Sequence, residues 1–71
     1  MPTPIVLRGD FITLSQALKV AGITGTGGHA KVSVRAGQIR VNGEVELRPG
    51  RKLRAGDRIV DEQGQEWIIQ P

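Results

Sequence analysis

The sequence predicts an α+β fold in which two short helices pack on a small antiparallel sheet of three to five strands. Helical spacing of apolar residues is confined to the first half of the chain, and short alternating apolar and polar segments follow in the second half. Turn-forming pairs such as Asn42-Gly43 separate those segments. The 71 residues leave room for one small core, so we expect a single domain over residues 1–71.

The first strand is expected at Ile5-Val6-Leu7, which is a short apolar run. A helix is expected over residues 14–21, where leucine and alanine recur at helical spacing. Thr13 and Gln16 have the form of a capping box, in which each side chain accepts a hydrogen bond from the other residue's backbone N–H. Gly22 suits the position just after the helix, where a left-handed conformation is common.

A second helix is expected to begin with Thr26 as its N-cap and to run to about Ala36, with Gly37 ending it. Its intrinsic helix propensity is poor, because it is rich in glycine and β-branched residues. Such a helix must be held by tertiary packing, and Ala30 and Val34 are the residues expected to supply it.

The second half of the chain predicts a series of short strands. Asn42-Gly43 is a strong signal for a type I′ hairpin turn. Trp67 lies in the last strand pattern, beside isoleucine, and is expected in the core. The strands of this half are expected at residues 39–41, 44–47, 58–60 and 66–69.

Charge is distributed unevenly along the chain. The formal net charge is +3, yet residues 19–58 hold nine Lys or Arg against three acids, a net charge of +6. Residues 59–71 hold three acids and no Lys or Arg. A basic stretch of this kind favours nucleic acid or another polyanion as a partner. A solvated surface with some charge asymmetry is the alternative interpretation.

Two segments carry backbone N–H groups or basic side chains that suit the binding of phosphate. Gly27 and Gly28 open the second helix, where backbone N–H groups and the helix dipole attract anions, although a flexible loop also explains such glycines. Lys31 and Arg35 follow on one helix face, and a basic hairpin surrounds Pro49-Gly50. The residues that we predict to bind RNA are Thr26, Gly27, Gly28, His29, Lys31, Arg35, Arg40, Arg48, Arg51 and Lys52.

No catalytic site, metal site or cofactor is expected. The chain has no cysteine and one histidine, which excludes thiolate and zinc sites. The glycine segment fails the P-loop pattern, because Ala30 precedes Lys31 and Val32 follows it. No signal pattern and no apolar run long enough to span a membrane is present. We therefore expect a monomeric protein of the bacterial cytoplasm, with no small-molecule substrate.

The low aromatic content argues against single-stranded nucleic acid as the ligand. There is one Phe, one Trp and no Tyr, too few for the stacking platforms that bind single strands. We therefore expect recognition of folded RNA by its shape and phosphate backbone. Double-stranded DNA is an alternative, since two helices joined by a short loop resemble a helix-turn-helix. However, the second helix begins with glycines where base-reading side chains would be needed.

The chain resembles one RNA-binding domain family. The stretches that carry the resemblance are Thr26-Gly27-Gly28-His29-Ala30-Lys31, Gly37-Gln38-Ile39-Arg40-Val41-Asn42-Gly43, Arg51-Lys52-Leu53 and Gly56-Asp57. The family was first described in the fourth protein of the small ribosomal subunit, and its core is called the αL motif. The likeness covers roughly residues 11–60 and is greatest to a branch of small stand-alone bacterial members.

The resemblance implies that RNA lies across the helix starts and a neighbouring hairpin. Many members place an arginine directly after the Ser or Thr that matches Thr26, whereas this chain has Gly27 there. Backbone N–H groups would then replace the missing guanidinium. The basic positions that the resemblance carries over are Lys31, Arg35, Arg51 and Lys52.

The sequence thus predicts a non-catalytic RNA-binding protein that recognises structured ribosomal or transfer RNA. One alternative is a β-grasp carrier, which the chain length and the Val41–Glu44 hairpin would fit. Such carriers use a C-terminal Gly-Gly as the reactive end, and the sequence ends in Ile69-Gln70-Pro71. The other alternative is an adaptor whose basic face docks an acidic protein partner.

Overall fold

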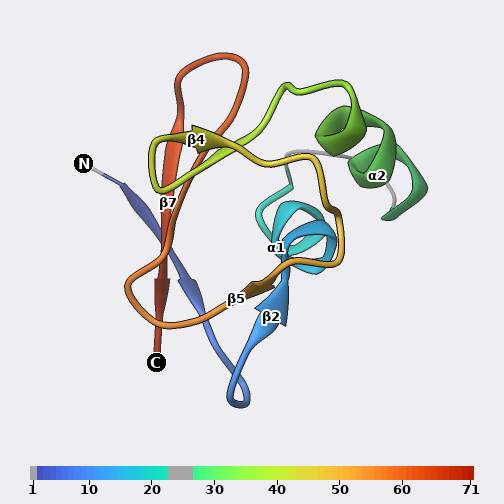
Figure 1. Ribbon diagram of the computed structural model, residues 1–71. Helices are drawn as coiled ribbons and strands as arrows, with labels where there is room; N and C mark the ends of the chain where they lie inside the picture. The colour runs from blue at the N-terminus through green and yellow to red at the C-terminus, as the bar shows by residue number, and fades with distance from the viewer. Residues whose placement is uncertain (1, 23–26) are drawn as a thin grey trace.

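The computed structural model describes residues 2–22 and 27–71. Both helices lie to one side of a five-stranded sheet (Figure 1), which confirms the predicted α+β fold. The strand order in this sheet is β1-β7-β6-β3-β4, and β2 pairs separately with β5. The elements in chain order are β1 (Thr3–Val6), β2 (Ile12–Thr13), α1 (Leu14–Val20), α2 (Gly27–Arg35), β3 (Arg40–Val41), β4 (Glu44–Val45), β5 (Lys52–Leu53), β6 (Arg58–Val60) and β7 (Glu66–Gln70).

One strand pairing differs from the antiparallel sheet that the sequence predicts. β1 runs parallel to β7, with Thr3 opposite Trp67 and Val6 opposite Gln70. The other pairings within this sheet are antiparallel. A parallel pair needs a long crossover connection, and here the helices and the remaining strands, which all lie between β1 and β7 in the chain, provide it. The sheet is therefore mixed, with β1 and β4 at its two edges.

The caps predicted for α1 are confirmed. Thr13 Oγ1 accepts a hydrogen bond from the N–H of Gln16 at 3.3 Å, and Gln16 Oε1 accepts one from the N–H of Thr13 at 3.1 Å. Gly22 follows the helix with φ of 74°, the left-handed conformation expected there. The side chains that α1 buries are those of Leu14, Ala17 and Leu18.

The second helix is held by packing, as predicted. Ala30 and Val34 are completely buried, and α2 packs against α1. Gly37 has φ of 78° and its N–H donates to the carbonyl of Val34, so glycine ends this helix too. The predicted N-cap, Thr26, lies outside the described residues.

A single cluster of apolar side chains fills the space between the helices and the strands. The prediction that Trp67 joins the core is confirmed, since 7% of it is exposed. The buried members of the cluster are Ile5, Leu14, Ala17, Leu18, Ala30, Val34, Ile39, Val41, Leu53, Ile59, Trp67 and Ile69.

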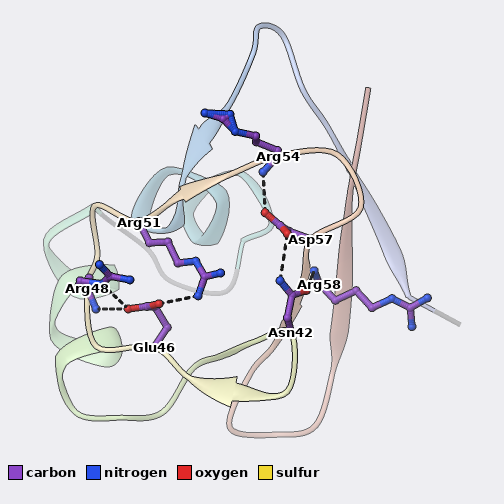
Figure 2. Close-up of polar contacts among 7 residues, drawn as sticks. All are labelled: Asn42, Glu46, Arg48, Arg51, Arg54, Asp57 and Arg58. Atoms are coloured by element: carbon purple, nitrogen blue, oxygen red, sulfur yellow. Dashed lines mark hydrogen bonds and ion pairs between the residues drawn. The ribbon is translucent and has the colours of Figure 1, made fainter.

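Side chains join the Asn42-Gly43 turn to the turn before β6 (Figure 2). Asn42 and Gly43 have φ of 54° and 86°, as a type I′ turn requires. Asn42 Nδ2 donates to Asp57 Oδ1 at 3.1 Å, and the N–H of Arg58 donates to Asn42 Oδ1 at 3.0 Å. Asp57 Oδ2 also accepts from the N–H of Arg54 at 2.8 Å. The β3–β4 turn is thereby tied to the turn before β6.

Replacing Asn42 tests this link. Asn42→Ala removes both side-chain bonds and places alanine at a positive φ, so we expect a loss of about 2 kcal/mol in the free energy of unfolding. Asn42→Gly removes the same bonds but tolerates the backbone, and should lose about half as much. Urea denaturation of the two variants measures both values, and equal losses would exclude a backbone contribution.

Candidate nucleic-acid interface

The basic segment, defined here as Arg48–Lys52, is anchored on the start of α1. The N–H of Leu14 donates to the carbonyl of Arg51 at 2.9 Å, and the N–H of Ser15 donates to the carbonyl of Pro49 at 3.0 Å. N–H groups in the first turn of a helix have no acceptor within the helix itself. The segment then enters β5, which pairs with β2. It is therefore a connection that caps α1, whereas the sequence suggested a hairpin.

A buried acid lies at the centre of this segment's interactions. Glu46 is 7% exposed, and its carboxylate accepts three hydrogen bonds. Oε1 accepts from the backbone N–H and the Nε of Arg48, both at 3.1 Å, and Oε2 accepts from Nη1 of Arg51 at 2.8 Å. The sequence analysis missed Glu46. The available signal was an acid two residues before a cluster of bases.

Ion pairing strongly favours the ionised form of Glu46. The hydrogen bonds from the side chains of Arg48 and Arg51 lower the pKa of Glu46 from 4.5 to about 2, although burial acts in the opposite direction. The same pair raises the pKa of Arg48. The ion pair of Glu46 with Arg48 is therefore fully charged throughout the neutral pH range.

The three cations of the basic segment differ in exposure. The side chain of Arg48 is 77% exposed and that of Arg51 is 31% exposed. Lys52 is exposed, and its Nζ lies 4.8 Å from the centre of the Phe11 ring, within the range of a cation–π contact. The segment thus presents charged groups to solvent, each already ordered by a neighbouring side chain.

The basic segment follows a stretch of chain that passes the end of α2 (Figure 1). A Cβ built on Gly37 would lie 3.8 Å from Val45 Cγ1 and 3.9 Å from Leu47 Cδ2, so the chain just after α2 lies close to side chains just before the segment. Lys31 and Arg35 are exposed on α2, four residues apart. The two groups of cations predicted from the sequence therefore lie on neighbouring elements.

Two of the predicted RNA-binding residues lie beside acidic groups. His29 and Ser33 of α2 line a hollow together with Asp61 and Glu62 of the β6–β7 turn. Arg40 lines a second hollow beside the same two acids. Helical geometry places the two basic residues of α2 on its other flank, away from His29 and Ser33. His29 therefore lies on a different flank of α2 from Lys31 and Arg35, although the sequence analysis placed all three in one RNA-binding group. Of the remaining predictions, Gly27 and Gly28 form the start of α2.

Residues 2–22 and 27–71 bring together no group of three acidic, histidine or cysteine side chains that could hold a metal ion. In the same residues, neither helix has the length and hydrophobicity needed to cross a bilayer.

The observed architecture is that of a small α+β domain carrying a basic segment beside a short helix. The family model described as "S4 domain" matches residues 5–69. The chain therefore belongs to the S4 domain family, which confirms the resemblance seen in its sequence. It is also similar to a protein of Bacillus subtilis (strain 168) named "Probable ribosome maturation protein RlbA". The two are 41% identical over 64 residues, which cover 90% of this chain and 89% of that protein.

Proposed function

We propose that this protein is a non-catalytic RNA-binding protein that recognises structured RNA by its phosphate backbone and shape. The observation that carries the proposal is the basic segment, which is hydrogen-bonded to the start of α1 and whose arginines are ordered by Glu46. Fixed guanidinium and ammonium groups suit phosphate oxygens. The cations that we assign to phosphate contacts are Lys31, Arg35, Arg48, Arg51 and Lys52.

The Bacillus relative carries the name "Probable ribosome maturation protein RlbA". We therefore propose ribosomal RNA as the first target to test, with transfer RNA as the second. Membership of the S4 domain family supports RNA over an acidic protein as the partner.

A non-catalytic role is supported by the state of the buried carboxylates. Glu46 is held by two arginines, and Asp61 Oδ1 accepts from the N–H groups of Gln63 and Gln65, both at 2.9 Å. A general base needs a lone pair directed at a substrate proton. Both oxygens of Glu46 and Oδ1 of Asp61 accept from groups of the protein instead.

The dependence of binding on salt tests the proposal. Fluorescently labelled fragments of ribosomal RNA should bind the wild-type protein, and a plot of log affinity against log salt should have a slope of about −4 for five phosphate contacts. A slope near zero would contradict backbone recognition. Capture from a lysate with and without nuclease separates RNA from the alternative, because an acidic protein partner would be retained after nuclease treatment.

A further inference from the structure

The position of Glu46 conflicts with simple electrostatics. An RNA site gains affinity from positive charge, and a carboxylate between two phosphate-binding arginines reduces the local field. Moreover, Glu46 is buried, which costs free energy for an ion unless it is well paired. If Glu46 contributes to RNA binding, it must do so by fixing the positions of the guanidinium groups of Arg48 and Arg51.

Glu46 bonds to one part of each guanidinium and leaves the other N–H groups for another acceptor. Arg48 reaches Glu46 through Nε, and Arg51 reaches it through a single terminal nitrogen, Nη1. A guanidinium carries five N–H donors in a rigid plane, so each retains donors for another acceptor. Figure 2 shows the two side chains approaching the carboxylate of Glu46 from its two oxygens. Within the described residues, no other side-chain acceptor is recorded for either guanidinium.

We propose that Glu46 is a positioning residue for RNA: it fixes the guanidinium groups of Arg48 and Arg51 so that their outward N–H groups together bind the oxygens of backbone phosphate. This inference rests on the proposed function and adds how the site is organised. A long, flexible arginine loses side-chain freedom when it binds a phosphate. Where the folded protein has already ordered it, that loss does not weaken binding.

The positioning role and simple charge predict opposite signs for one substitution. Glu46→Gln raises the net charge by one, so electrostatics alone predicts tighter RNA binding. If Glu46 orders two arginines, the same change should weaken binding about threefold to tenfold, because both must then be ordered by the RNA. Glu44→Gln is the matched control: Glu44 is exposed two residues earlier, in β4, and its loss should leave affinity unchanged or slightly higher.

The probe is fluorescently labelled fragments of ribosomal RNA, and anisotropy gives the affinity of each variant. Circular dichroism measures the folded fraction of Glu46→Gln at the assay temperature, and the affinity is corrected for it. Tighter or unchanged binding by the Glu46→Gln variant would overturn the inference.

A second pair of variants avoids any loss of the buried acid. Arg48→Lys keeps the charge but has no Nε–H to donate to Glu46. We expect RNA affinity to fall about threefold while the slope of log affinity against log salt stays the same. Arg54→Lys is the control, because the recorded hydrogen bond of Arg54 is made by its backbone N–H. Equal affinity of the two lysine variants would also overturn the inference.

Different results would contradict the proposed RNA binding and the proposed positioning role of Glu46. If the wild-type protein shows no salt-dependent binding to RNA, the proposed function is wrong. If the wild type binds with the expected slope and Glu46→Gln binds at least as tightly, only the positioning role is wrong.

Discussion

Glu46→Gln is expected to lower the free energy of unfolding by about 2 kcal/mol at pH 7. The two arginines lower the pKa of Glu46 from 4.5 to about 2. At about 1.4 kcal/mol per pKa unit, the whole difference corresponds to about 3 kcal/mol. We expect less, because the side chain of Arg48 is 77% exposed and solvent screens its charge. For a domain of this size, the loss corresponds to a fall of about 10 °C in Tm.

The dependence of this stabilisation on pH has a definite sign. Since the pKa of Glu46 is lowered by folding, the folded protein keeps the carboxylate ionised where the unfolded chain takes up a proton. The stabilisation is complete above about pH 4.5 and is lost as the pH falls towards about 2. Urea denaturation at a series of pH values should therefore show wild type and Glu46→Gln converging in acid.

Glu44→Gln provides the control for the stability measurement. Glu44 is exposed, and a substitution at such a site changes stability by about 0.5 kcal/mol or less. A constant difference between wild type and Glu46→Gln from pH 7 to pH 2 would show that the effect comes from packing and does not come from the ionised carboxylate.

Features encoded by neighbouring residues could be predicted from the sequence. The capping box of Thr13 and Gln16 and the Asn42-Gly43 turn each depend on residues within a few positions of one another. The burial of Ala30 and Val34 follows from their spacing on one helix face. Local patterns of this kind can be interpreted without knowledge of the rest of the fold.

Features that depend on distant segments could not be predicted. The parallel pairing of β1 with β7 joins the two ends of the described chain, and no local pattern records it. Alternation along residues 44–47 would bury Val45 and Leu47 and expose Glu46, yet Val45 is 50% exposed, Leu47 is 56% exposed and Glu46 is buried. The acid faces inward because two arginines later in the chain return to it.

The candidate site shows the same division. The spacing of Lys31 and Arg35 and the cluster of bases near Pro49 were visible in the sequence. In the structure Lys31, Arg35, Arg48 and Lys52 are exposed, and the side chain of Arg51 is 31% exposed. The acidic neighbours of His29 were not visible, because they depend on where the β6–β7 turn lies against α2. Net charge along the chain cannot show which bases share a face.

Replacing Lys31 and Arg51 together is expected to reduce RNA affinity about twentyfold at physiological salt. Two phosphate contacts would be lost, so the slope of log affinity against log salt should change from about −4 to about −2. Glutamine is the substitution of choice at both positions, because it removes the charge, and at position 51 it keeps an N–H donor for Glu46. All RNA fragments should be weakened alike, since phosphate contacts carry no base sequence information.

The control for this variant replaces two arginines outside the proposed site, Arg8→Gln with Arg58→Gln. Both are exposed, and Figure 2 shows the side chain of Arg58 directed away from Arg48 and Arg51. The control changes the net charge by the same amount, so it shares any effect of long-range attraction. If phosphates are bound beside α2 and the basic segment, the control keeps a slope near −4. Equal changes of slope in both double variants would mean that RNA responds to the total charge of the protein, and the interface would then have to be sought elsewhere.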